Sequence, residues 1–178
     1  MSSDDVFFRE TQRFRQPFLW AILLVIAGLQ TTVFGAAMIS QLVRRVPWGS
    51  RPMSDLGLAA AGTAAIGFSL ALLLFFWFAE LVTEVRSDGV YCRFRFLQRR
   101  PRRLLWDEIR SFEAVTYRPL REYGGWGIRI GRNGMAYSVS GNRGVRFHQK
   151  EGGHVLIGSQ RPQEMVDAIR AARRARKA

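Results

Sequence analysis

The sequence has a single cysteine, Cys92, and two histidines, His148 and His154, among its 178 residues. A lone cysteine excludes a disulfide-stapled fold and a metal site built from several cysteines. A zinc site needs three or four ligands, and Glu151 is a possible third ligand beside the two histidines. No acidic residue stands near either histidine in a triad-like motif, so no base is available to activate the thiol. We therefore expect no enzyme activity, no metal ion and no cofactor.

Charge is absent from two long stretches. Residues 16–43 contain no Asp, Glu, Lys or Arg over 28 positions, and residues 56–79 contain none over 24 positions. A helix needs about 20 apolar residues to cross a bilayer. Buried core helices are one alternative, and a cleavable signal peptide is another for the first stretch. We predict transmembrane helices at about 18–41 and 56–80, and the short connection between them makes 18–80 an antiparallel hairpin.

Small residues recur at every fourth position in both predicted helices. Such stripes let helix backbones approach closely in lipid, where packing drives association. Chance is the alternative, because the second helix is rich in Ala and Gly. The predicted helix-packing positions are Gly28, Thr32, Ala36 and Ser40 in the first helix and Gly57, Ala61, Ala65 and Ser69 in the second.

Positive charge is unevenly distributed around the apolar stretches. Ten Lys or Arg residues flank them on the side of the two termini, against three in the connection. Cytoplasmic segments carry the excess of Lys and Arg. We therefore predict a multi-pass protein of the plasma (inner) membrane with both termini in the cytoplasm. Residues 1–17 are expected to form a cytoplasmic amphipathic segment at the membrane interface, or alternatively the start of the first helix.

From Leu81 onward the sequence consists of short β-rich runs separated by turn residues. Pairs such as Asp88-Gly89 and Asn133-Gly134 are typical of turns between strands. The runs predict about seven strands, all antiparallel, with a basic loop at 98–103. Residues 81–178 are thus predicted to form a cytoplasmic domain that folds alone.

The last element is predicted to be an amphipathic helix. Pro162 suits its first position, and basic residues, including Lys177, suit its negative C-terminal end. Its apolar stripe is predicted at Met165, Val166, Ile169 and Ala172.

Strands followed by one C-terminal helix resemble the pleckstrin-homology-like (PH-like) fold. The whole chain also resembles an uncharacterised family of small prokaryotic membrane proteins, through segments such as LVTEVRSDGVYCRF and EYGGWGIRIGRNGMAYSVSGNRGVRF. The resemblance implies an α+β architecture: an antiparallel transmembrane helical hairpin plus a PH-like partly open β-barrel of about seven strands capped by a C-terminal helix. It implies no catalytic or binding residue. The Lys/Arg pocket of phosphoinositide-binding relatives is not expected, because the first loop is only Ser87-Asp88-Gly89.

Basic residues gather after the second apolar stretch. Anionic lipid attracts each basic residue near its surface by about 1 kcal/mol, and ordinary positive-inside topology is the alternative explanation. A lipid-binding site for anionic headgroups is predicted at Arg99, Arg100, Arg102 and Arg103. Tyr123 and Trp126, beside several glycines, are a candidate interaction surface, with burial of Trp126 in the barrel core as the alternative. Nucleic acid is not expected as a partner, because no recognised reading motif accompanies the charge.

These features together predict a non-enzymatic, membrane-anchored scaffold or adaptor. Its PH-like domain would bind a protein or anionic lipid at the inner leaflet. The alternative is an accessory subunit of a larger membrane complex, docking through its transmembrane helices. The expected partners are membrane lipids, anionic headgroups, and a protein partner or a second copy of the chain in a homo-oligomer.

Overall fold

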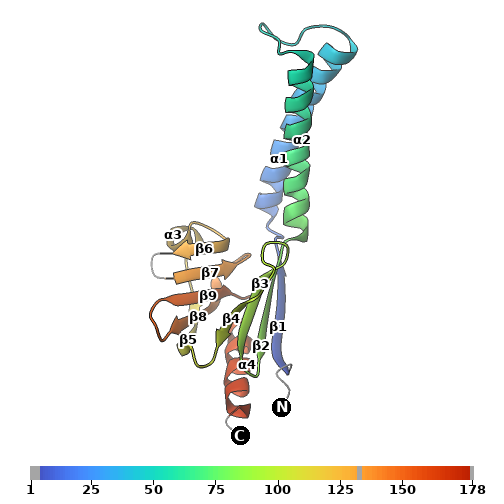
Figure 1. Cartoon of the computed structure of the whole chain (residues 1–178). Coiled ribbons are helices and arrows are strands. Elements are labelled where there is room, and N and C mark those ends of the chain that lie inside the picture. Colours follow the sequence, from blue (N-terminus) through green and yellow to red (C-terminus); the bar gives the residue numbers. More distant parts are fainter. Residues whose placement is uncertain (1–4, 132–133, 177–178) are drawn as a thin grey trace. The chain divides into compact units, whose positions relative to one another are not determined.

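The computed structural model describes residues 5–131 and 134–176. In these ranges the chain forms four α-helices, one π-helical turn and nine strands, so the fold class is α+β (Figure 1). The chain divides into two compact units. The helical unit comprises Arg15–Trp77, and the β unit combines the chain up to Phe14 with the chain from Phe78 onward. The β unit is therefore discontinuous in sequence, because the helical unit interrupts it.

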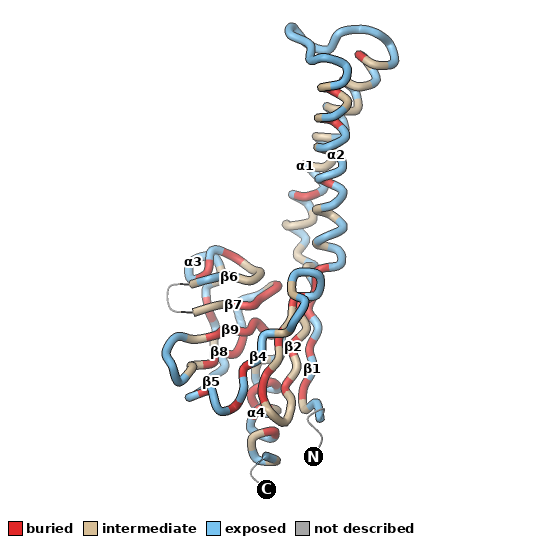
Figure 2. The backbone as a smooth tube through the Cα atoms, in the orientation of Figure 1, coloured by how far each residue is buried: buried red, intermediate tan, exposed pale blue. Residues whose placement is uncertain are grey.

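Two long apolar helices make up the helical unit. The first, α1 (Pro17–Met38), continues as a π-helical turn (Ile39–Val43), and the second is α2 (Asp55–Phe78), whose last residue counts with the β unit. Only 11% and 17% of their most apolar windows are buried (Figure 2). The core helix of a soluble protein would be mostly buried. By length and composition, both helices are able to span a membrane.

Small and polar residues join α1 to α2. A Cβ atom at Gly62 would lie 2.7 Å from the sulfur of Met38, so a larger residue here would force the Met38 side chain to move. The hydroxyl of Ser69 donates a hydrogen bond to the side-chain oxygen of Gln30. The two helices thus approach closely at Gly62 and share a polar contact within an otherwise apolar pair.

The predicted small-residue stripes differ in where they lie. On α2, Ser69 is buried, and Gly57, Ala61 and Ala65 are half-buried. On α1, Gly28, Thr32 and Ala36 are exposed and Ser40 is half-buried. Ser69 of the α2 stripe therefore contributes to the contact between the helices, whereas the α1 stripe is largely exposed.

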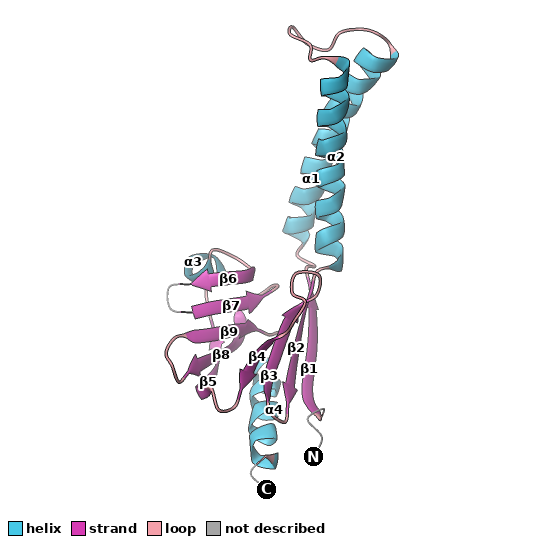
Figure 3. Ribbon diagram, in the orientation of Figure 1, coloured by secondary structure: helices cyan, strands magenta, loops and turns pink. Residues whose placement is uncertain are grey.

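A four-stranded antiparallel sheet forms the first half of the β unit (Figure 3). Its strands, in spatial order, are β1 (Val6–Arg13), β2 (Glu80–Arg86), β3 (Gly89–Phe94) and β4 (Arg102–Leu105). The predicted turn at Asp88-Gly89 is confirmed, because β2 and β3 pair across it. Residues 1–17 were expected to form an amphipathic segment or the start of the first helix. This expectation is wrong for Val6–Arg13, because these residues form β1, which pairs with β2 and places Arg13 opposite Glu80.

The second sheet has five strands and a mixed topology. Its strands are β5 (Ile109–Thr116), β6 (Gly127–Gly131), β7 (Gly134–Ser138), β8 (Arg143–Gln149) and β9 (His154–Gly158). Their spatial order is β5-β8-β9-β7-β6, and β7 runs parallel to β9. The prediction that all strands are antiparallel is therefore wrong, and the described residues form two sheets rather than a closed barrel. The predicted turn residue Asn133 lies outside the described residues.

Two further helices complete the β unit. The short α3 (Pro119–Tyr123) was not predicted, whereas α4 (Pro162–Ala175) begins at the predicted proline. The predicted apolar stripe of α4 is confirmed, because Met165, Val166, Ile169 and Ala172 are all buried. These side chains join one core cluster with residues of both sheets. Lys177 lies outside the described residues.

Candidate functional site

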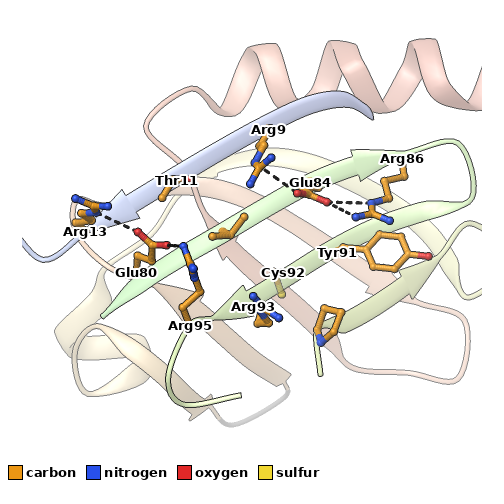
Figure 4. Close-up of a pocket in the computed structure, with 12 residues that line it drawn as sticks. Arg9, Thr11, Arg13, Glu80, Glu84, Arg86, Tyr91, Cys92, Arg93 and Arg95 are labelled. Carbon is orange, nitrogen blue, oxygen red and sulfur yellow. Dashed lines mark hydrogen bonds and ion pairs between the residues drawn. The ribbon is translucent and has the colours of Figure 1, made fainter. Parts of the chain in front are cut away.

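The outward side of β1, β2 and β3 carries a cluster of charged side chains. Alternate residues of a strand point to opposite faces, and on β1 the inward residues Phe8, Glu10 and Gln12 are buried. The outward residues of the three strands, together with Arg95 directly after β3, line a cavity of about 610 Å³ (Figure 4). We call this surface the arginine face; its charged and aromatic members are Arg9, Arg13, Glu80, Glu84, Arg86, Tyr91, Arg93 and Arg95.

At one end of the arginine face, two arginines hold one carboxylate. Arg13 donates to Glu80 at 3.0 Å, and Arg95 donates to the other oxygen of Glu80 at 2.5 Å. The Glu80 side chain is only 6% exposed. Burial alone would raise its pKa, but the hydrogen bonds from Arg95 and Arg13 outweigh burial and lower the pKa of Glu80. This carboxylate therefore stays ionised and fixes both arginines.

The other end of the arginine face has a second carboxylate and a tyrosine. Glu84 pairs with Arg9 at 3.5 Å and with Arg86 at 2.6 Å. The Arg86 guanidinium also lies 4.8 Å from the centre of the Tyr91 ring. Burial, together with a hydrogen bond to the Asp88 carboxylate, raises the pKa of Tyr91, so its hydroxyl stays protonated.

The middle of the arginine face lacks a carboxylate. Here Val82 is the register partner of both Thr11 on β1 and Arg93 on β3. Arg93 is half-buried and forms no ion pair with any described residue. The face as a whole has five arginines against two glutamates, which leaves three positive charges. An anionic group entering this cavity would find the Arg93 guanidinium free to bind it.

The four predicted lipid-binding arginines do not form one surface. Arg99 and Arg100 are exposed in the turn region after β3, but Arg102 and Arg103 belong to β4, so the predicted loop at 98–103 is wrong at its end. Arg102 is the register partner of buried Cys92, whereas Arg103 pairs with Tyr91 and lies 5.8 Å from its ring centre. Since neighbouring strand residues face opposite ways, only Arg103 adjoins the arginine face.

The aromatic pair predicted as an interaction surface is largely engaged within the β unit. Tyr123 is buried, and its hydroxyl lies 2.8 Å from Nε2 of His154. Trp126 is half-buried, and its indole N–H donates to the carbonyl of Gly141 at 2.8 Å. Tyr123 is therefore unavailable for a partner. Trp126 does not belong to the buried core, so the barrel-core alternative is wrong for this residue.

The single cysteine is buried in the β unit. Burial raises the pKa of Cys92 to about 12, so the thiol is protonated at neutral pH and is a poor nucleophile. Among the described residues, no group of three His, Cys, Asp or Glu side chains is placed to hold a metal ion. The guanidinium groups of the arginine face, by contrast, are suited to binding an anion.

Comparisons with protein-family models, with curated proteins and with solved structures gave no match for this chain. The site therefore stands on its geometry alone. Sequence reasoning missed Arg9, Arg13, Arg86, Arg93 and Arg95 as one surface. The alternation of arginines with inward residues was visible in β3, but β1 was not identified as a strand, so its arginines could not be placed beside the others.

Proposed function

We propose that this chain is a two-pass integral membrane protein that holds its β unit at the cytoplasmic face of the plasma membrane. The pairing of Arg13 with Glu80 supports an even number of passes, because the residues flanking the helical unit are neighbours in one sheet. Trp20 near the start of α1 and Trp77 near the end of α2 also meet, with ring centres 5.9 Å apart. Tryptophans favour the membrane–water interface, and these two would share one interface of an antiparallel hairpin.

The orientation rests on charge. Ten Lys or Arg residues flank the helices on the side of the termini, against three in the connection, which favours cytoplasmic termini. A PH-like description of the β unit is supported by its antiparallel four-stranded sheet and by α4 packed into the core. The parallel pair of β7 and β9 departs from that description, so the family resemblance is part of the proposal.

The β unit works by binding, and the ligand is the anionic headgroup of a lipid. The observation that carries this function is Arg93, half-buried in a cavity of about 610 Å³ without a carboxylate partner among the described residues. Arginine binds phosphate through two parallel N–H donors, which makes it suited to phosphodiester headgroups. The neighbouring arginines are held in position by Glu80 and Glu84, so little side-chain entropy is lost when a phosphate binds.

The test uses the full chain in detergent micelles, with native mass spectrometry counting bound phosphatidylglycerol against phosphatidylcholine. Replacing Arg9 and Arg93 by Gln should lower the affinity for phosphatidylglycerol by about 2 kcal/mol, or roughly 30-fold, at about 1 kcal/mol per charge. The matched control replaces the exposed Arg118 and Arg121 near α3 and should leave the affinity unchanged. Equal losses in both variants, or no preference for the anionic lipid, would contradict headgroup binding at the arginine face.

A second function, an accessory subunit of a membrane complex, is favoured by α1 itself. Its small residues Gly28, Thr32 and Ala36 are exposed, so a partner helix could pack closely against them. The partner would be another protein or a second copy of the chain. Replacing Thr32 by Leu should then abolish co-purification of this partner. The control Thr63→Leu, at an exposed position of α2, should leave co-purification unchanged.

A further inference from the structure

The turn between β3 and β4 exposes two large apolar side chains. The Phe96 side chain is 76% exposed and Leu97 is 53% exposed, in a turn directly after the last residue of β3. Phe96 also has a φ of 72°. A bulky residue with positive φ is a genuine outlier, and such strain persists only where the surrounding structure holds it.

Hydrogen bonds fix this turn on both sides. The Gln98 side-chain oxygen accepts from the Phe94 N–H at 3.1 Å, and the Gln98 N–H donates to the Phe94 carbonyl at 3.0 Å. The Arg95 N–H donates to the Glu80 carbonyl at 2.9 Å. The turn is therefore a defined structure that presents two apolar side chains outward.

Within the β unit, the apolar turn contacts Phe78. The ring of Phe96 lies 5.9 Å from the ring of Phe78, which is the last residue of α2. Arg99 lies two residues after Leu97, and Arg99 and Arg100 are both exposed, with no partner among the described residues. An apolar tip beside the end of a membrane-spanning helix, followed by basic residues, has the composition of segments that lie in a bilayer interface.

We infer that residues 96–100 form a membrane wedge, in which Phe96 and Leu97 enter the interfacial layer and Arg99 and Arg100 contact anionic headgroups. The inference rests on the proposed membrane location of the chain, but it is independent of the arginine face. The occupant of this apolar tip is the lipid bilayer, because the tip adjoins the residue at which α2 ends. The wedge gives the β unit a lipid contact of its own and fixes its orientation relative to the membrane.

The experiment uses the full chain in lipid nanodiscs with an environment-sensitive fluorophore on single introduced cysteines. Native Cys92 is buried and stays unlabelled. The positions are Leu97→Cys in the wedge, Leu24→Cys on exposed α1, and Leu120→Cys on α3, where the leucine is 70% exposed. Nitroxide-bearing lipids should quench the probe at 97 severalfold more than at 120, most strongly with a nitroxide near the headgroup. The probe at 24 should be quenched most strongly by a nitroxide deep in the acyl chain.

Each outcome separates the wedge from the proposed function. If the probe at 24 is quenched and the probe at 97 behaves as at 120, the wedge is refuted and the membrane anchor stands. If the probe at 24 is not quenched, the anchor itself fails. A blue-shifted but unquenched probe at 97 would show that a protein surface covers the tip, which also overturns the lipid assignment.

A second variant removes the wedge without damaging the fold. Glycine adopts positive φ without strain, so Phe96→Gly should leave the melting temperature of the β unit unchanged or raised. The same variant should lower the lipid quenching of a probe at 97 severalfold. Unchanged quenching in Phe96→Gly, or a β unit that unfolds with it, would contradict the role assigned to this side chain.

Discussion

The helical unit and the β unit use apolar residues in opposite ways. In α1 and α2 most large apolar side chains are exposed, whereas those of the β unit gather in a core that unites both sheets and α4. The same hydrophobic effect acts on both. In the β unit the chain itself removes apolar surface from water, whereas in the helical unit that surface stays exposed, and in the proposed function a bilayer covers it. The contrast predicts different responses to matched changes in the two units.

The largest difference should appear when one unit is removed. A fragment of residues 81–178 lacks β1, whose inward residues Phe8, Glu10 and Gln12 are buried, and it leaves the edge of β2 unpaired. We expect this fragment to aggregate rather than to fold. A chain in which a short Gly/Ser linker replaces residues 15–77 should melt cooperatively in circular dichroism, because Arg13 and Glu80 are already neighbours. A cooperative melt of the 81–178 fragment would show that β1 is dispensable.

A buried charge should distinguish the units next. Ile169 on α4 is fully buried, so Ile169→Asp should destabilise the β unit by more than about 3 kcal/mol and prevent its folding. Leu24→Asp on exposed α1 should leave the unfolding of the β unit unchanged and reduce insertion of the chain into membranes. Chemical denaturation of the β unit, in the chain whose residues 15–77 are replaced by the Gly/Ser linker, measures the effect of Ile169→Asp. Membrane flotation of the full chain measures the effect of Leu24→Asp. If Leu24→Asp prevented the β unit from folding, the contrast between the two units would be contradicted.

Polar contacts should matter more in the β unit than between the helices. Glu10 is buried and accepts hydrogen bonds from the Ser159 hydroxyl at 2.5 Å and from the Gln160 N–H at 2.9 Å. Glu10→Ala leaves these donors unsatisfied and should cost about 1–3 kcal/mol. Ser69→Ala removes the contact to Gln30 and should cost only about 0.6 kcal/mol, the average for polar contacts in a membrane. Unfolding free energies of each unit test the order, and the reverse order would refute it.

The smallest effect concerns reactivity without a change in stability. Burial raises the pKa of the Cys92 thiol to about 12, so a maleimide at pH 8 should not modify the folded protein. Complete modification is expected once denaturant exposes the thiol, with intact-mass spectrometry as the readout. Rapid labelling under native conditions would mean that β3 opens readily and that the core of the β unit is less closed than described.

The sequence was most informative where one pattern dominated. Uncharged runs predicted α1 and α2, and the apolar stripe of α4 was predicted residue by residue, because each pattern is local. The strand β1 was missed because its pairing with β2 spans the whole helical unit, and its Phe and Arg residues also suit an amphipathic helix. The parallel pairing of β7 with β9 depends on a non-local strand order, which turn residues do not encode. The arginine face needs both β1 and β3, so it could not be predicted while β1 was unassigned.

Topology tests the central claim, that both ends of the helical unit lie on one side of the membrane with the β unit in the cytoplasm. The measurement is labelling by a membrane-impermeant maleimide in intact cells, with Cys92 replaced by Ala and single cysteines placed at Ser50 and Glu151. Both positions are exposed, one in the connection between the helices and one between β8 and β9. We predict labelling at 50 in intact cells and at 151 only after permeabilisation. Labelling at 151 in intact cells, or of both positions alike, would contradict the account.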